Sequence, residues 1–134
     1  QQIQVLNNTG NVLRYLGRNE EALEAYRQAV AIDPKCIHPY NGLGNALFGL
    51  GDQERNPSRK REYYEQALEA CRQAVAIDPK YARLYNGLGN VLRALGRNKE
   101  AVEAYRKLID LADKKEDDYW IKQAEKIIAE LQNK

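Results

Sequence analysis

The sequence has few of the side chains that catalytic and metal-binding sites need. Its 134 residues include two cysteines, one histidine and no methionine. Two cysteines are too few for a disulfide framework or a zinc site, and His38 has no cysteine or acid at ligand or triad spacing. We therefore expect no enzymatic activity, no metal and no cofactor, and we expect Cys36 and Cys71 to stay reduced.

An excess of one charge and long apolar runs are also missing. The chain carries 21 basic and 19 acidic side chains, a net charge of +2, which is too balanced to indicate nucleic acid or an anionic membrane as a partner. No apolar stretch is long enough to span a bilayer. We expect a cytoplasmic protein without a membrane partner, for which nucleic acid is an unlikely ligand. The absent methionine suggests a segment of a longer chain.

What the sequence does contain is internal repetition. Three blocks recur: RQAVAIDPK at 27–35 and 72–80, YNGLGN at 40–45 and 85–90, and LGRN at 16–19 and 95–98. The spacing of equivalent residues is 34 from Gly10 to Gly44, but 45 between the two Asp-Pro pairs. An insertion of eleven residues therefore lies between Gly51 and Ala67.

Each repeated unit predicts two helices. In the first, Leu43, Gly44 and Leu47 follow the i, i+1, i+4 spacing of a buried helical stripe. We expect the helix glycine to face alanine on the second helix, so that the two backbones approach closely. A second glycine should end each first helix, because glycine tolerates positive φ. These helix-ending residues are Gly17, Gly51 and Gly96.

A unit of 34 residues with this pattern resembles the tetratricopeptide repeat. The second unit carries the resemblance most fully, with Tyr40, Leu43, Gly44, Leu47, Gly51, Ala67, Ala74 and Pro79. The first unit has Leu6 in place of the aromatic residue, and the third has Asp113 in place of proline. The resemblance implies an all-α fold, a right-handed solenoid of three helix pairs in a single domain, 1–134. The expected units are about 3–36, 37–81 and 82–115.

One further amphipathic helix is expected over residues 118–132, with Asp117 as its N-cap. Its apolar stripe comprises Trp120, Ile121, Ala124, Ile127, Ile128 and Leu131. Lys122, Lys126 and Glu130 fall on the opposite side, so this helix should cap the end of the solenoid.

The resemblance also implies that the first helices line a concave groove that binds a protein or peptide. One polar stripe on these helices, spaced 3, 4, 3, is not required by the core. Its amides can bind a peptide backbone and its arginines a carboxylate, so we expect an acidic or carboxylate-ended peptide. Besides Gln4, the predicted groove residues are Asn7, Asn11, Arg14, His38, Asn41, Asn45, Phe48, Arg83, Asn86, Asn90 and Arg93.

Two structural alternatives stay open for this stripe. The second asparagine of each pair can instead bond a neighbouring helix and only fix the repeat geometry. Gly42 and Gly87, each costing about 1 kcal/mol in a helix, can admit either a bound backbone or a neighbouring helix. The resemblance to repeats that hold a chaperone's C-terminal carboxylate is partial, because Asn7 stands where those repeats have lysine, so no chaperone tail is assigned.

A different functional hypothesis is an engineered or self-assembling scaffold, which the long identical blocks would permit. The first helix also offers Ile3, Val5, Leu6 and Leu13 to a side that no earlier unit covers. Either further repeats precede it, or two chains pack here as a homo-oligomer.

The insertion is expected to lengthen the second helix, because eleven residues are close to three turns at ~3.6 residues per turn. Asn56 and Pro57 predict its start, as cap and first helical residue. The basic run 59–61 would then be exposed, either as a contact surface or as a solvated hairpin without function.

Overall fold

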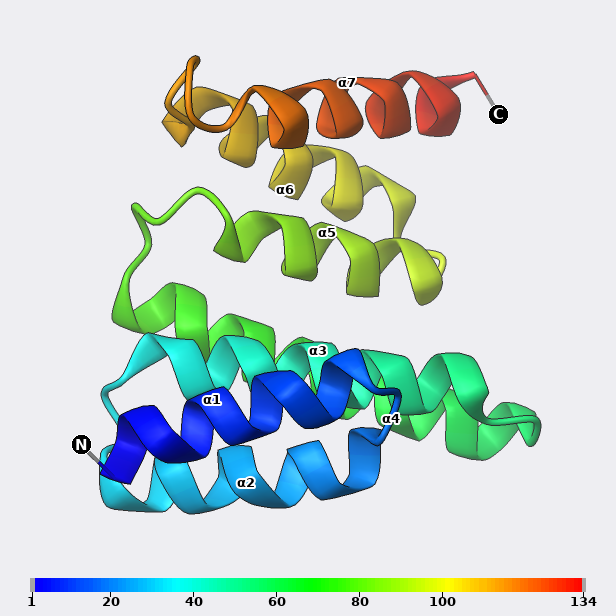
Figure 1. The fold of residues 1–134 in the computed structure, drawn as a ribbon. Helices are drawn as coiled ribbons and strands as arrows, with labels where there is room; N and C mark the ends of the chain where they lie inside the picture. The colour runs from blue at the N-terminus through cyan, green and yellow to red at the C-terminus, as the bar shows by residue number, and fades with distance from the viewer. Residues whose placement is uncertain (1, 134) are drawn as a thin grey trace.

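The computed structural model describes residues 2–133, and these residues form helices and no strands (Figure 1). Over the same residues no helix is both long and apolar enough to cross a membrane. The helices are α1 (Gln2–Tyr15), α2 (Asn19–Ile32), α3 (Ile37–Gln53), α4 (Pro57–Ile77), α5 (Leu84–Ala94), α6 (Asn98–Leu111) and α7 (Asp118–Gln132).

Each helix packs against the next one along the chain, and the first helices of the units, α1, α3 and α5, also contact one another (Figure 1). The result is three stacked pairs, α1 with α2, α3 with α4 and α5 with α6, followed by α7. This confirms the all-α solenoid predicted from the repeat.

Two of the three helix glycines pack against aromatic rings rather than against alanine. A Cβ built at Gly10 would lie 2.6 Å from the ring of Tyr26, and one at Gly89 would lie 2.7 Å from the ring of Tyr105. Both tyrosines are fully buried. The expectation that glycine faces alanine was therefore wrong for Gly10 and Gly89, where the missing side chain makes room for an aromatic ring on the partner helix. A Cβ at Gly44 would lie 2.8 Å from Cys71 Sγ and 3.5 Å from the backbone oxygen of Ala67.

The turns inside the units follow the prediction in two cases out of three. Gly17 and Gly96 have φ of +80° and +78°, the left-handed conformation that glycine adopts without strain. Gly51 was expected to do the same and does not, because α3 continues through it to Gln53. There it is buried, and a Cβ at this position would lie 2.6 Å from the ring of Tyr64.

The insertion lengthens both helices of the second unit, and not the second helix alone. The residue equivalent to the end of α1 is Gly49, so α3, which continues to Gln53, ends four residues later in the repeat. The residue equivalent to the start of α2 is Tyr64, so α4 is seven residues longer. Together these account for the eleven inserted residues. Asn56 caps α4 as predicted, accepting the backbone N–H groups of residues 58 and 59 at 3.0 and 3.2 Å.

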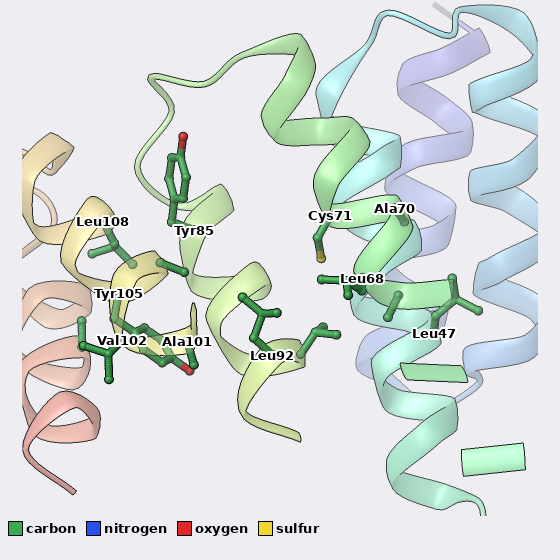
Figure 2. Packing of buried hydrophobic residues seen from close by; sticks show 14 of the residues in the cluster. Leu47, Leu68, Ala70, Cys71, Tyr85, Leu92, Ala101, Val102, Tyr105 and Leu108 are labelled. Carbon is green, nitrogen blue, oxygen red and sulfur yellow. The ribbon is translucent and has the colours of Figure 1, made fainter. Parts of the chain in front are cut away.

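The core runs along the stack from Leu23 on α2 to α7, and Figure 2 shows part of it. It contains buried side chains from every unit boundary, including Leu47, Leu68, Leu92 and Leu108. On α7, Ala124 and Leu131 are buried while Lys122 is exposed, as expected of a cap with one inward face. Helix α7 begins without a side-chain N-cap hydrogen bond, so the N-cap role predicted for Asp117 was wrong.

Candidate functional site

The predicted groove residues lie on α1, α3 and α5 or at their starts, and these three helices are neighbours. Their surroundings differ from unit to unit. At equivalent positions, some side chains are hydrogen-bonded within the fold, whereas others remain available to a ligand.

In the first unit, Asn11 and Arg14 are both bonded to Tyr26 of α2. The Tyr26 hydroxyl donates to Asn11 Oδ1 at 2.5 Å and accepts from Arg14 Nε at 3.3 Å. The ring of Tyr26 is fully buried, so its hydroxyl holds a fixed position at the edge of the groove. For Asn11 the structural role left open by the sequence is therefore the one observed.

The third unit repeats this arrangement. The hydroxyl of Tyr105 on α6 donates a hydrogen bond to Asn90 Oδ1. Burial raises the pKa of Tyr105 to about 12, and the nearby positive charge of Arg93 opposes that rise. The tyrosine–asparagine bond thus recurs in two units at positions 79 residues apart in the sequence, each time with an arginine three residues after the asparagine.

The second unit has lost two of the three members of this group. Cys71 stands at the tyrosine position and Phe48 at the arginine position, while Asn45 is retained. Within residues 2–133 no side-chain hydrogen bond engages Asn45. The thiol of Cys71 is buried, which raises its pKa to about 12, so it is neutral and a weak donor at physiological pH.

Phe48 turns toward the insertion instead of toward a tyrosine hydroxyl. Its ring lies 5.5 Å from that of Tyr64, which is buried at the base of the lengthened hairpin. Tyr64 donates to Asp52 Oδ1 at 2.6 Å, and burial followed by this bond raises its pKa to about 12. Phe48 is therefore half-buried and packs against the base of the insertion.

The side-chain oxygens of Asn41 and Asn45 lie near Gly87, which is buried on α5. A Cβ built at Gly87 would lie 3.6 Å from Asn45 Oδ1 and 3.7 Å from Asn41 Oδ1. These are ordinary contact distances, so a side chain would fit there. At the equivalent Gly42 a Cβ would lie 2.3 Å from the Tyr26 ring. The approach of a neighbouring helix explains Gly42, whereas no packed neighbour requires the glycine at 87.

An opening lies between the starts of α1 and α3. A hollow of about 450 Å³ is lined by Asn7, His38 and Cys36, among other residues. Asn7 Oδ1 is buried there and has no hydrogen-bond partner among residues 2–133. The ring of His38 also meets Tyr81 edge-on, with 6.1 Å between centroids. This amide oxygen needs a donor from a ligand or from water.

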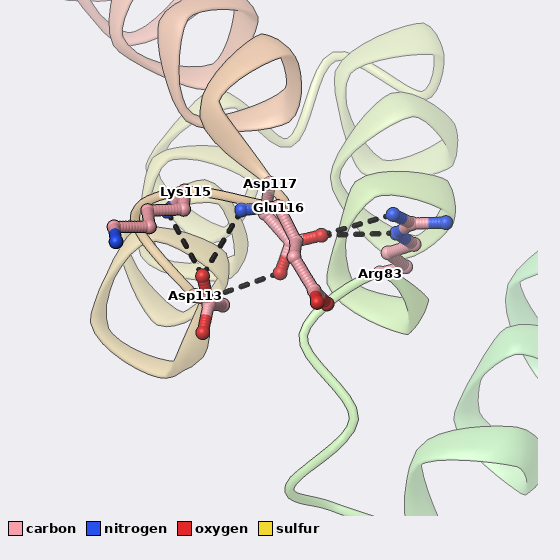
Figure 3. Close-up of polar contacts among 5 residues, drawn as sticks. All are labelled: Arg83, Asp113, Lys115, Glu116 and Asp117. Atoms are coloured by element: carbon pink, nitrogen blue, oxygen red, sulfur yellow. Dashed lines mark hydrogen bonds and ion pairs between the residues drawn. The ribbon is translucent and has the colours of Figure 1, made fainter.

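One of the two predicted residues at the start of the third unit, Arg83, is bonded to the residue that precedes α7. Arg83 donates two bonds of 3.1 Å to Asp117 Oδ1 (Figure 3). Its guanidinium lies 5.8 Å from the Trp120 ring. Asp117 Oδ2 accepts from the backbone N–H of Asp113, which is why it does not cap α7. Asn86 is half-buried on α5.

Sequence reasoning missed the tyrosines of the second helices as members of the site. Tyr26 and Tyr105 occupy the same position of the repeat, and their hydroxyls decide which asparagine is already bonded. The signal was present in the sequence, because the unit that has cysteine instead of tyrosine also has phenylalanine instead of arginine.

Two family models match the chain. One, described as a TPR repeat, covers residues 10–51, and the other, described as the tetratricopeptide repeat, covers residues 61–114. Together they cover more than half of the sequence. A search of curated proteins finds no match.

Solved structures of TPR proteins superpose over almost the whole chain. A thermophilic TPR protein of Thermus thermophilus is 27% identical, with a TM-score of 0.85, over 98% of this chain. This chain spans 64% of the length of that protein.

Two similar structures contain a bound peptide. The Yersinia enterocolitica type III secretion chaperone SycD, in complex with a peptide of the translocator YopD, is 17% identical, with a TM-score of 0.83 over 96% of this chain and 91% of its own. The second TPR domain of human RPAP3, in complex with the HSP70 peptide SGPTIEEVD, is 21% identical, with a TM-score of 0.80 over 99% and 97%. Identities this low show the shared fold alone.

Proposed function

Because the chain belongs to the tetratricopeptide repeat family, we propose that it is a non-catalytic module that binds an extended segment of a partner protein along α1, α3 and α5. Peptide complexes of similar folds, including SycD with its YopD peptide, support this proposal. No chemistry is required of the groove: it supplies amides and arginines to a ligand, which is a binding function.

The observation that carries the proposal is the state of Asn45. Its equivalents Asn11 and Asn90 are bonded by tyrosine hydroxyls, and the tyrosine of its own unit is replaced by Cys71. Its amide oxygen and that of Asn41 lie side by side near Gly87 of α5. Two neighbouring amides that carry no side-chain hydrogen bond within residues 2–133 are suited to pair with the N–H and C=O groups of an extended peptide, whatever its sequence.

The charge of the stripe favours an acidic ligand or a C-terminal carboxylate. The stripe includes Arg14 and Arg93 and no acidic side chain. Arg83 contributes less, because Asp117 already compensates its charge. The peptide in the human RPAP3 complex, SGPTIEEVD, is acidic at its C-terminal end, which agrees with this ligand class.

The proposal is tested with fluorescein-labelled ten-residue peptides, acidic or neutral, each with a free or an amidated C-terminus. We expect acidic peptides with a free carboxylate to bind most tightly in fluorescence anisotropy. Asn45→Ala should weaken binding about 5- to 150-fold, since a lost buried hydrogen bond costs roughly 1–3 kcal/mol. Its thermal stability should not change, because nothing within residues 2–133 is bonded to that side chain. Unchanged binding by a folded Asn45→Ala protein would refute the proposal.

A matched pair of variants at Cys71 tests the same point without altering the groove residues. Cys71→Tyr restores the hydroxyl that is present in the other two units, and we expect it to bond Asn45 and to reduce peptide binding. Cys71→Phe adds nearly the same volume without the hydroxyl, and should bind peptide more tightly than Cys71→Tyr. Equal binding by the two variants would show that the amide of Asn45 does not contact the ligand.

A further inference from the structure

The hollow between the starts of α1 and α3 combines apolar walls with one buried oxygen that has no hydrogen-bond donor among residues 2–133. Ile3 and Pro39 supply the walls, and Asn7 supplies the oxygen, Oδ1. Ile3 was expected on a side of the first helix that no earlier unit covers, but it is half-buried and lines this hollow. The volume of about 450 Å³ lies within the usual range of ligand pockets, roughly 300–1,000 Å³, so an aromatic ring fits.

The equivalent place between α3 and α5 is occupied by an aromatic side chain of the protein itself. His38 and Tyr81 stand there, and their rings meet edge-on with 6.1 Å between the centroids. Their equivalents at the first boundary are Gln4 and Cys36, which both line the hollow. Tyr81 is half-buried in its place, whereas the side chain of a cysteine is too short to fill the same space. The hollow is therefore the space that a tyrosine occupies one unit later.

The repeat assigns this space to the link between α2 and α3, and not to an element before α1. Cys36 and Tyr81 each follow the same block, RQAVAIDPK, and lie in the links that lead to α3 and α5. At the second boundary it is this link, from α4 to α5, that brings a side chain to His38. The first hollow is thus open because Cys36 stands at the tyrosine position, whatever precedes the first helix.

The next position in the series is also occupied, by an ion pair. Arg83 is the equivalent of Gln4 and His38, and Asp117 holds its guanidinium at 3.1 Å. Three equivalent positions thus meet an aromatic ring, a carboxylate and, at Gln4, a hollow. The first boundary is the one of the three at which a side chain from a ligand can take the place of an internal partner.

We propose that this hollow binds a tyrosine side chain of the partner peptide, with its ring against Ile3 and Pro39 and its hydroxyl donating to Asn7 Oδ1. The inference rests on the proposed function, because the ligand must already lie along α1 and α3. A tyrosine ring buries apolar area, and its hydroxyl supplies the donor that the buried oxygen lacks. Phenylalanine would leave that oxygen without a donor. Lysine would bring a charge into a hollow whose lining has no acidic side chain.

The position of the tyrosine within the ligand follows from the geometry of α3. His38, at the hollow, and Asn45 are seven residues apart on this helix, about 10 Å at ~1.5 Å per residue. An extended chain covers that distance in about three residues. The tyrosine should therefore lie about three residues from the peptide group that Asn45 contacts, so one position in a peptide should be favoured over the others.

Fluorescein-labelled ten-residue peptides of alanine and glutamate with a free C-terminal carboxylate test this proposal. One tyrosine is placed at each position in turn, and binding is measured by fluorescence anisotropy under reducing conditions, because Cys36 is a free thiol. At one position we expect tyrosine to bind about 10-fold more tightly than alanine, through burial of the ring. It should bind about 5-fold more tightly than phenylalanine there, the net effect of one hydrogen bond. Equal affinities for tyrosine and alanine at every position would overturn the proposal.

Two variants place the tyrosine in the hollow. Cys36→Tyr should fill the space as Tyr81 fills its equivalent, and should abolish the preference for tyrosine over alanine without changing the affinity for the tyrosine-free peptide. Asn7→Leu keeps the volume and removes the oxygen, so it should abolish only the preference for tyrosine over phenylalanine. Its fold should be retained, which circular dichroism checks, because the oxygen it removes is unbonded. A full tyrosine preference in folded Cys36→Tyr, or an undiminished preference over phenylalanine in folded Asn7→Leu, would overturn the proposal.

The same titrations separate this inference from the proposed function. Asn45→Ala should weaken the binding of every peptide, including the tyrosine-free one, whereas the hollow variants should change only the response to tyrosine. Binding that depends on Asn45 but shows no preference for tyrosine would overturn the hollow and leave the groove standing. If none of the peptides binds the wild-type protein, both are wrong.

Discussion

The boundary between the first and second units and the boundary between the second and third are built on the same pattern but filled differently. At the first, the ring of Tyr26 fills the space between Gly10 and Gly42. At the second, Cys71 lies between Gly44 and Gly87, and its Sγ would be 2.8 and 3.7 Å from a Cβ at those positions (Figure 2 shows Cys71 between α4 and α5). The second boundary thus has glycines at the same two positions, although no aromatic ring lies between them.

The unit that lacks the tyrosine is also the unit that carries the insertion. Tyr64, at the base of the longer hairpin, is 8% exposed and packs against Phe48 and Gly51. In the second helix pair the buried aromatic ring is therefore that of Tyr64, at the far end of the pair, and not one at the middle position that Cys71 occupies. This leaves two neighbouring groove amides in the middle of the second unit, Asn41 and Asn45, without side-chain hydrogen bonds within residues 2–133.

The largest effect expected from this difference is on stability. Tyr26→Cys copies the second unit into the first and should lower the free energy of unfolding by about 3–5 kcal/mol, the range for truncating a fully buried aromatic side chain. Cys71→Ala removes only a thiol and should cost far less. Urea denaturation of both variants measures the two values. Similar losses for the two would contradict the claim that the boundaries are packed differently.

A smaller effect should distinguish the two equivalent glycines. Gly42→Ala places a methyl group 2.3 Å from a buried ring, and overpacking of this kind costs about 1–3 kcal/mol. Gly87→Ala meets nothing closer than 3.6 Å and should gain up to about 1 kcal/mol from helix propensity. The same urea titrations report the opposite signs. A destabilising Gly87→Ala would show that the space beside Gly87 is filled in solution.

The smallest effect concerns the tyrosine hydroxyls. Tyr105→Phe removes the donor to Asn90 and should cost about 1 kcal/mol at neutral pH. Because the pKa of Tyr105 is raised in the folded protein, its contribution is complete below the ordinary tyrosine pKa near 10. It declines as the pH rises toward about 12. Thermal melts from pH 9 to 12 should fall less steeply for Tyr105→Phe than for the wild type.

The helix pairs could be predicted from the sequence because the same pattern of apolar and turn residues occurs in three units. The internal period located the insertion, and Asn56 and Pro57 located the start of α4. The prediction for Gly51 was wrong for a physical reason. A glycine can end a helix, but it does so only where the residues that follow it do not continue the helix. With Asp52 and Tyr64 bonded across the longer hairpin, α3 continues instead.

The polar stripe was also visible in the sequence, but the state of each of its members was not. Asn11, Asn45 and Asn90 are the same residue at the same position, so no local rule distinguishes them. Their partners lie on the second helices, 15 residues away in the two units that have a tyrosine. Side-chain contacts between helices depend on the distance and rotation at which the helices pack, which periodicity does not specify.

The sequence by itself therefore determined the number of helices, their pairing and the face that each one buries, because hydrophobic spacing and turn residues are local properties that repeat. Only the tertiary structure decided that Tyr26 and Tyr105 bond two of the three asparagines and that Asp117 holds Arg83. Each of these depends on which surfaces meet when the units stack, and stacking brings together residues that are distant in the chain.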